Sequence, residues 1–432
     1  MHERELPLRP LLSPSKTPSS HAIDSPLPSP SKQATELNTL LQDFFGPRQA
    51  KRDYRADAAG VLMANPSASP PKLKTMAAHL FQFSADGRKS VVPSHHQHTL
   101  FDQDMYLCAH TFESDAGWKN TEVYFWVGDD VSPSAVESAS AFVLREAKQL
   151  GGSLVKVQQG RETPGLIQAL GGIIVTQRGT GNKDDSLAPH MFCGRRYLGQ
   201  VVFDEVDFSP ATLCSGFPYL VAKGGNCFLW KGKGSNVDEL GCARLIGMDY
   251  ALSGELVEVD DGREPDSFWG LFDGGSKLAS ADHWRLKPNY EKYSSRLFHS
   301  DAAAKQQIIE LSPFSQRDLQ PTGIYVMDAF FELYIIVGSK AQSQYASFHN
   351  ALDFAQEYAI LAAGMEDRPF VPISTVVLEG APRDLKSVFR RWRDADSPTV
   401  MPAPPPPPGS GLKRGRSMRV VTLNQALQAL NE

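Results

Sequence analysis

The sequence has few cysteines and no long apolar run. Its 432 residues include 5 cysteines, an odd number, and no two of them form a Cys-x-x-Cys pair. We therefore expect most of them to be small buried side chains, as in a reducing compartment. No stretch approaches the roughly 18 apolar residues of a membrane span. Residues 1–7 lack the apolar core of a signal peptide, so we expect a cytoplasmic protein with no membrane span.

The chain also lacks an excess of positive charge and any familiar catalytic signature. Lysine and arginine number 44 against 49 aspartates and glutamates, which gives a formal net charge of −5. A general nucleic-acid binder needs a basic face, so we expect no nucleic-acid partner. The sequence contains no Gly-x-Ser-x-Gly, no His-Glu-x-x-His and no paired Cys/His signature. We therefore expect a protein that is not an enzyme.

What the sequence does contain is one phrase that occurs three times. Each copy begins with a strand-like apolar run that ends in glycine, and a helix-like run follows. The marker glycines are Gly128, Gly232 and Gly338, and their separation of about 105 residues is too long for a solenoid repeat. Three tandem copies of one small domain favour a protein that binds at several places over one with a single active site.

The second half of the phrase is a turn followed by a short amphipathic stretch. Gly160-Arg161-Glu162 opens it in the first copy and Gly262-Arg263-Glu264 in the second, whereas the third copy is faded. Because these residues recur, we interpret them as structural and not catalytic. Glycine would supply the turn, and an Arg/Glu pair would tie strand to helix.

Strand-like and helix-like runs alternate without a strict βαβ rhythm, which predicts an α+β fold with mixed sheets. We place the three repeats at residues 76–180, 190–285 and 294–395. Long helices are expected over residues 134–150, 237–252 and 343–361, and short helices over residues 163–170, 265–272 and 383–393. Ser132-Pro133 is typical of an N-cap followed by proline at the first helical position.

The segment before the first repeat has two parts. Residues 1–34 are rich in serine and proline and predict a disordered tail whose Ser-Pro pairs suit a proline-directed kinase. Residues 35–75 contain a helix and a linker. The helix carries an apolar stripe at i, i+3, i+4, i+7 and i+8 from Leu37 to Phe45. It either docks a partner or, as amphipathic helices usually do, packs on the first domain.

Residues 396–432 form a second low-complexity tail. Its proline run, Pro404–Pro408, suits an SH3, WW or profilin-type groove and equally suits a spacer. A short amphipathic helix is expected over residues 420–430.

The combination of an aromatic strand ending in Trp-x-Gly, a long helix, and Gly-Arg-Glu before a stretch ending in Gly-Gly resembles the gelsolin/villin family of actin-binding proteins. Arg296-Leu297-Phe298 is similar to the start of the family's last repeat, and the order resembles the C-terminal three repeats of a six-repeat member. The resemblance implies three tandem gelsolin-like domains, each a mixed sheet held between a long and a short helix. It also implies actin binding, with severing or barbed-end capping under calcium and phosphoinositide control at the actin cytoskeleton.

The resemblance further implies calcium sites made of an Asp before an early strand and a Glu in the first turn of the long helix. In the first repeat these positions match Asp104 and Glu137, with Gln103 where the family usually has glycine. Calcium prefers such oxygen ligands. The same residues also suit a solvated Asp and a Glu favoured by the helix dipole without any metal.

The other two repeats match the calcium pattern less well. In the second repeat the helix position holds Asp238, but the strand position holds Phe217, and a lone carboxylate is a weak calcium site. In the third repeat the positions hold Gly323 and Ser347, so the site looks lost. We therefore expect calcium in the first repeat only, and an actin contact that depends little on it.

The implied actin contact lies on the long helix of the first repeat, whose exposed face would include Ser138, Arg145 and Gln149. Two other patterns lack the spacing of a site. The histidines at 95–98 have no Cys or carboxylate at zinc-ligand spacing, and residues 231–235 lack the spacing of a phosphate-binding loop. Both are interpreted as turns.

A second functional hypothesis stays open. The repeats could keep the fold but have lost actin contacts, so that the protein is a scaffold or adaptor whose Ser-Pro tail and proline run recruit partners. The faded third repeat and the missing carboxylates motivate this alternative.

Overall fold

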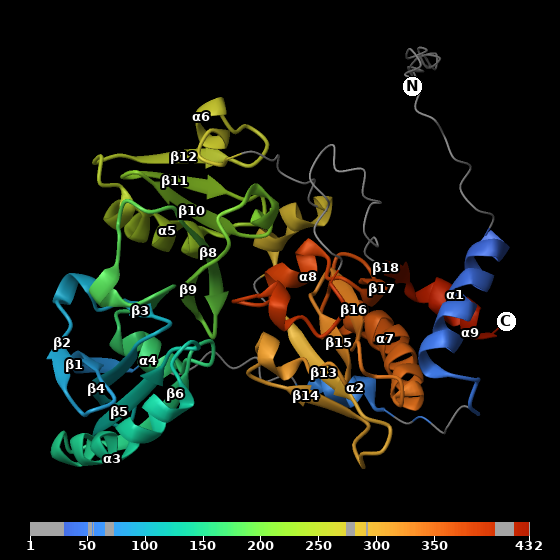
Figure 1. Ribbon diagram of the computed structural model, residues 1–432, viewed down its shortest axis with the longest axis horizontal. Coiled ribbons are helices and arrows are strands. Elements are labelled where there is room, and N and C mark those ends of the chain that lie inside the picture. The colour runs from blue at the N-terminus through green and yellow to red at the C-terminus, as the bar shows by residue number, and fades with distance from the viewer. Residues whose placement is uncertain are drawn as a thin grey trace, which may run out of the picture.

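The computed structural model describes residues 30–50, 54, 56–64, 73–273, 281–290, 293–401 and 419–431. The strands form three β-sheets, each with helices on its faces (Figure 1). The predicted α+β architecture with three mixed sheets is confirmed. The Ser-Pro pairs before residue 30 and the run Pro404–Pro408 lie outside the described residues.

The first sheet has the strand order β2-β1-β4-β5-β6. Its strands are β1 (Lys74–Phe83), β2 (Lys89–Val91), β4 (Met105–Glu113), β5 (Lys119–Val127) and β6 (Ser153–Gln158). β4 and β5 pair antiparallel, whereas β5 and β6 pair parallel, so the sheet is mixed. The long helix α3 (Pro133–Gln149) covers one face through Val143, and the short helix α4 (Pro164–Ala169) covers the other through Ile167.

The start of α3 follows from its sequence. Ser132 is the N-cap, and its hydroxyl oxygen accepts a hydrogen bond from the Ala135 backbone N–H, while Pro133 occupies the first helical position. At the other end Gly151 has a φ of 70°, a left-handed conformation that glycine adopts at low cost. The predicted range of this helix is therefore confirmed to within one residue at each end.

The second sheet has seven strands in the order β12-β11-β10-β8-β9-β7-β3. They are β3 (Thr99–Phe101), β7 (Ile173–Gln177), β8 (His190–Tyr197), β9 (Gln200–Glu205), β10 (Pro218–Lys223), β11 (Asn226–Lys231) and β12 (Leu256–Asp260). Two of these strands, β3 and β7, come from the range expected for the first repeat. The helix α5 (Val237–Tyr250) covers one face, and α6 (Asp266–Trp269) packs on the other.

The third sheet has the order β14-β13-β15-β16-β17-β18. Its strands are β13 (Arg296–Ser300), β14 (Ile308–Leu311), β15 (Ile324–Asp328), β16 (Glu332–Val337), β17 (Ile373–Glu379) and β18 (Arg419–Thr422). The long helix α7 (Tyr345–Met365) covers one face and α8 (Arg383–Val388) the other. The final helix α9 (Leu423–Asn431) was predicted, but the short strand β18 before it was not.

Short 3-10 turns connect these elements. They are η1 (Ser94–His96), η2 (Gly181–Lys183), η3 (Pro210–Thr212), η4 (Asp282–Asn289), η5 (Gln316–Asp318) and η6 (Asp394–Asp396). In the described part of the chain, no helix combines the length and the apolarity needed to cross a membrane.

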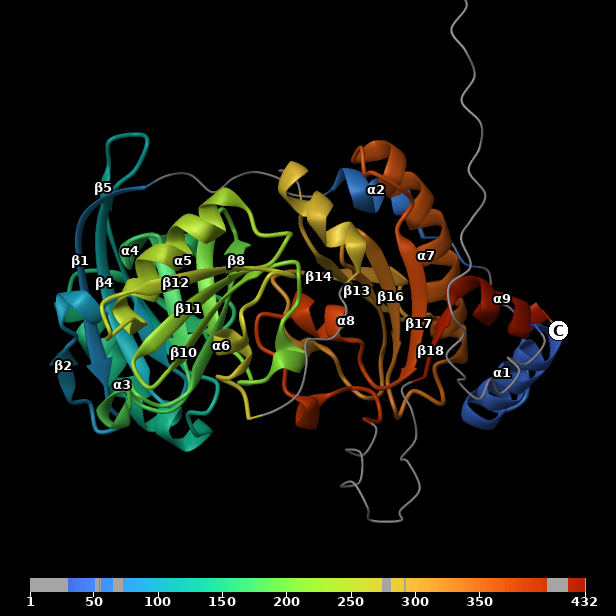
Figure 2. The same ribbon diagram turned by 90° about the horizontal axis from the view of Figure 1, so that it is seen from above.

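We call each of the three repeats, at residues 76–180, 190–285 and 294–395, a module. The N-terminal helix α1 (Pro30–Phe45) packs on the third module and not on the first, so the expectation that it packs on the first domain is wrong. The Phe45 ring stacks on the Phe348 ring of α7 with centroids 5.1 Å apart. The second helix, α2 (Ala58–Met63), also contacts α7. Figure 2 shows α1 beside α9, at the far end from the first sheet. An apolar stripe predicts that a helix face is buried, but not which domain buries it.

Candidate functional site

The repeated phrase is held together by one hydrogen bond that occurs in both clear copies. In the first, the Trp126 indole Nε1 donates to Glu162 Oε1 at 2.9 Å. In the second, the Trp230 indole Nε1 donates to Glu264 Oε1 at 2.8 Å. The backbone N–H of the turn glycine donates to the same carboxylate oxygen in each copy. Glutamate therefore ties the aromatic strand to the turn, and the phrase is structural.

The arginine of the first phrase has a different partner from the one expected. Arg161 Nη2 donates to Asp318 Oδ1 at 2.6 Å, so it reaches the third module and does not tie its own strand to its own helix. A second ion pair joins the same two modules with the charges reversed: Arg317 Nη2 of the third module lies 3.0 Å from Asp129 Oδ1 of the first. The first and third modules are thus joined by charged side chains.

Arg390, just after α8, joins all three modules. Its guanidinium donates two hydrogen bonds to Asp204 on β9, each of 2.9 Å, and a further one to Glu162. Burial alone would raise the pKa of Asp204, but the Arg390 charge and its hydrogen bonds hold that pKa below its ordinary value. The predicted short helix over residues 383–393 ends at Val388 in the structure. Arg390 and the two arginines that follow it, Arg391 and Arg393, therefore lie after the helix, where they reach the other modules.

Arg391 and Arg393 continue this contact on an acidic cluster of the first module. Arg391 binds Asp102 and Asp130, and Arg393 binds Asp130. The Asp102 side chain is 2% exposed. Burial raises the pKa of Asp102 although Arg391 acts in the opposite direction. We call Arg390, Arg391 and Arg393 the arginine clasp.

The two calcium candidates of the first repeat lie in different surroundings. Asp104 lines an open cavity of about 810 Å³ together with Asp130, Gln103 and others. Its carboxylate accepts hydrogen bonds from the Thr180 hydroxyl at 2.7 Å and from the Gly181 backbone N–H at 2.9 Å. Glu137 is exposed on the outer side of α3 and is not among the residues lining that cavity.

The two aspartates that line this cavity differ in their suitability as calcium ligands. Asp104 offers an oxygen ligand with neutral hydrogen-bond donors among its described partners, whereas Asp130 is already bound by two arginines. Calcium takes six to eight oxygen ligands, and its affinity rises with the number of charged ones. Asp104 therefore offers one carboxylate in this cavity, and a calcium site that pairs it with Glu137 remains a prediction.

The carboxylate that matters structurally in the second repeat is not Asp238, which is exposed, but the next residue, Glu239. Lys287 Nζ lies 2.9 and 3.1 Å from the two Glu239 carboxylate oxygens and 2.9 Å from the Gly216 carbonyl oxygen. Both side chains are at most 4% exposed. Burial lowers the pKa of Lys287, while Glu239 opposes the shift. The Lys287 ammonium group thus already binds both carboxylate oxygens of Glu239, the residue next to Asp238.

Sequence reasoning missed Glu239, although a signal was present. Asn236 and Glu239 form a reciprocal capping box at the start of α5, with Asn236 Oδ1 accepting from the Glu239 N–H. In the third repeat, Ser347 uses its hydroxyl to accept from the Ala302 backbone N–H. This side chain carries no carboxylate for calcium, as its residue type already indicated.

The long helices differ in how much of their outer face is free. On α3 the actin-contact candidates Ser138, Arg145 and Gln149 are all exposed. On α5 an apolar stripe faces outward, because Val237 is 84%, Leu245 65% and Met248 53% exposed.

The third long helix, α7, is partly covered on its outer side, although Ile360 near its C-terminal end is 61% exposed. α1 and α2 pack on it, and Leu41, Phe45 and Leu62 join the same buried cluster as α7 residues. The two turn segments also lie as expected: the histidines at 95 and 96 belong to η1 before β3, and residues 232–235 connect β11 to α5. Neither forms part of these helix faces.

Comparisons with known proteins show which families and proteins this chain is similar to. A family model described as a gelsolin repeat matches residues 306–386, and one described as a domain of unknown function matches residues 79–178. Advillin of Mus musculus is 27% identical over 302 residues, which cover 68% of this chain and 36% of advillin. Gelsolin of Gallus gallus is 26% identical over 306 residues, with coverage of 68% and 38%. Gelsolin of Xenopus laevis is 28% identical over 258 residues, with coverage of 57% and 60%.

A chain in a solved complex titled Thorarchaeota 2DGel3/rabbit actin matches this protein at 17% sequence identity. The match covers 45% of this protein and 98% of that chain. Its TM-score of 0.19 is too low to show a shared arrangement. The sequence matches show that the chain is similar to proteins with gelsolin-like repeats. They confirm the resemblance to the gelsolin/villin family, and the gelsolin-repeat match lies within the range expected for the third repeat. The chain spans 36 to 60% of the length of these three relatives.

Proposed function

We propose that this protein binds actin as a gelsolin/villin-type protein and that its role is binding and not catalysis. The gelsolin repeat and the gelsolin and advillin relatives support the assignment, because the family that the sequence resembles binds actin. The observation that carries it furthest is the contrast among the long helices. α3 and α5 present free outer faces, whereas α1 and α2 cover part of α7.

Two free helix faces in one chain suit a polymer. Arg145 and its polar neighbours on α3 supply charge and hydrogen-bonding groups, while Leu245 and Met248 on α5 supply apolar area. Linking two modest sites raises overall affinity through effective concentration. Engagement of two neighbouring actin subunits would allow the protein to cap or sever filaments, and it would place the protein at the actin cytoskeleton.

Calcium would act on the first module only. Asp104 would supply a carboxylate oxygen to the ion, and no second-module counterpart is proposed because Lys287 occupies the Glu239 oxygens. We therefore propose that actin binding persists in the presence of a calcium chelator and that calcium changes it modestly.

The test is co-sedimentation of the full chain with filamentous actin. Arg145→Glu and the pair Leu245→Asp with Met248→Asp are each expected to weaken binding by at least about tenfold, because single interface hot spots are worth 2 kcal/mol or more. Ile360→Asp is the matched control, since Ile360 is 61% exposed on α7. It should leave binding unchanged. Absence of co-sedimentation by the folded wild-type chain would favour the scaffold hypothesis instead.

A further inference from the structure

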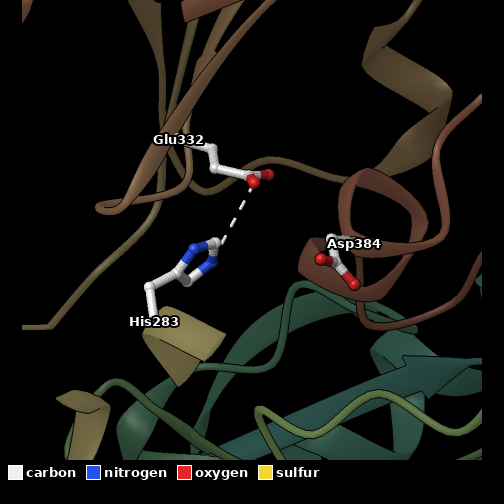
Figure 3. A group of neighbouring side chains, drawn as sticks. All are labelled: His283, Glu332 and Asp384. Carbon is white, nitrogen blue, oxygen red and sulfur yellow. Dashed lines mark ion pairs between the residues drawn. The ribbon is translucent and has the colours of Figure 1, made fainter. Parts of the chain in front are cut away.

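His283, Glu332 and Asp384 come together from three separate segments of the chain. His283 lies on η4, Glu332 opens β16 and Asp384 lies in the first turn of α8. One potential metal-ligand atom of each residue lies within 4.8 Å of those of the other two. Figure 3 shows the imidazole and the two carboxylates pointing toward one another. This is the one such group of three His, Cys, Asp or Glu side chains within the part of the chain that the structure describes.

The histidine is the unusual member of this group. Its side chain is 8% exposed, and its Nε2 atom is buried without a hydrogen-bond partner. That nitrogen lies 4.0 Å from Glu332 Oε1, too far for a hydrogen bond. A buried imidazole nitrogen is normally satisfied. Here an unsatisfied nitrogen lies near two carboxylates, a set of donor atoms that can bind a cation.

The two carboxylates are held in place by their neighbours. The Tyr334 hydroxyl donates to Glu332 Oε2, which leaves Oε1 for the histidine side. Asp384 has Arg383 Nε at 3.5 Å and the Cys214 thiol at 3.6 Å from its Oδ1 atom, both long contacts. Burial and the Asp384 charge raise the pKa of Glu332 to about 7. Arg383 supplies one positive charge beside Asp384, and outer-shell contacts of this kind orient metal ligands.

We propose that His283, Glu332 and Asp384 bind a divalent transition-metal ion of the zinc class. Imidazole nitrogen and carboxylate oxygen suit Zn²⁺, at about 2.0–2.2 Å from the ion, whereas calcium prefers six to eight oxygens. Tetrahedral ligands at that radius lie about 3.4 Å apart, so the 4.0 Å His283–Glu332 separation needs to shorten by only about 0.6 Å. Water would take the fourth position.

The place of the site suggests what the ion does. η4 follows the second sheet, where its Trp284 belongs to the core, whereas β16 and α8 belong to the third module. An ion bound by all three would cross-link these modules. Since metal binding to the folded state alone adds to stability, zinc should raise the unfolding temperature.

The test uses the full chain, freed of metal with a chelator and then given Zn²⁺ alone. We expect the wild-type chain to retain one equivalent of zinc after gel filtration and to unfold at a higher temperature with zinc. His283→Gln, Glu332→Gln and Asp384→Asn should each lose at least about tenfold in zinc affinity. Controls are His299→Gln, a half-buried histidine on β13, and Cys214→Ala, which removes a neighbour and not a ligand.

Co²⁺ provides a second readout that does not depend on how stable a variant is. Cobalt bound to the wild-type chain should show the visible absorption of a four-coordinate ion, and the three ligand variants should lack it while their far-ultraviolet circular dichroism stays unchanged. The proposal is overturned if the wild-type chain retains no zinc, if the ligand variants retain a full equivalent, or if Cys214→Ala loses binding as they do.

Discussion

The Trp126 indole donates a 2.9 Å hydrogen bond to Glu162, and Trp230 and Glu264 make the same bond in the second repeat. The bond joins the two halves of the repeated phrase, which stand more than thirty positions apart in the chain. In the first repeat Glu162 also accepts from Arg390. The glutamate therefore ties its own repeat together and binds the third module as well.

Replacement of Glu162 by alanine should destabilise the protein strongly. It removes the partner of the buried Trp126 indole and one of the two carboxylates that face Arg390. Breaking a buried ion pair by removing one side costs about 3–5 kcal/mol. We expect the free energy of unfolding measured in urea to fall accordingly, whereas Glu255→Gln, an exposed carboxylate after α5, should change that free energy by less than about 0.5 kcal/mol.

Replacement of Arg391 by alanine should loosen the contact between the first and third modules. Arg391 binds Asp102, whose side chain is almost completely buried. A hydrogen bond to a charged group contributes about 1.5–3 kcal/mol. We expect a larger radius of gyration by small-angle X-ray scattering and faster proteolysis between the modules. An exposed lysine provides the control: if Lys305→Ala changes the scattering as much, the arginine clasp does not hold these modules together.

Replacement of Phe45 by alanine should destabilise the third module and leave the first unchanged. The Phe45 ring is 6% exposed and packs on Phe348 and Tyr345 of α7. Phenylalanine-to-alanine changes in a core cost about 3–5 kcal/mol. Hydrogen exchange is expected to speed up in α7 and α9 and to stay the same in α3. Faster exchange in α3 instead would show that α1 stabilises the first domain after all.

Stability should fall as the pH rises through the titration of His190. Its Nδ1 faces Glu205 Oε1 at 2.8 Å and its Nε2 faces the Asp185 carbonyl at 3.0 Å. The hydrogen bond to Glu205 raises the pKa of His190 above 6.5 despite its burial. The stabilising contribution is complete below pH 6.5 and is lost as the pH passes the higher folded-state pKa.

Unfolding midpoints in urea at about pH 6 and about pH 9 measure this effect. The wild-type chain should lose more stability between the two than His190→Gln does. Equal losses in the two proteins would assign the pH dependence to other groups.

Local signals in the sequence were sufficient to predict much of the fold. Ser132 and Pro133 predict the start of α3, and the recurring Trp and Gly-Arg-Glu residues indicate repeated modules. What α1 packs against could not be predicted, since its stripe shows only that one face is buried. The residue-level resemblance was clearest in the first two copies, yet the gelsolin-repeat match falls on the third.

The candidate sites were harder to predict than the fold. Asp238 and Glu239 differ by one position; the capping-box spacing from Asn236 favours Glu239, and the buried contact with Lys287 shows that Glu239 is built into the structure. His283, Glu332 and Asp384 have no motif spacing, because three distant segments bring them together. Long-range contacts of this kind leave no local pattern in a single sequence.

Hydrogen exchange of the full chain with and without filamentous actin tests the central claim most directly. We predict that actin slows exchange in α3, around Arg145, and in α5, around Leu245, while α7 under its cover of α1 and α2 stays unchanged. The same result should appear with a calcium chelator present. No slowing anywhere, or slowing confined to α7, would contradict the proposal that the free faces of α3 and α5 bind actin.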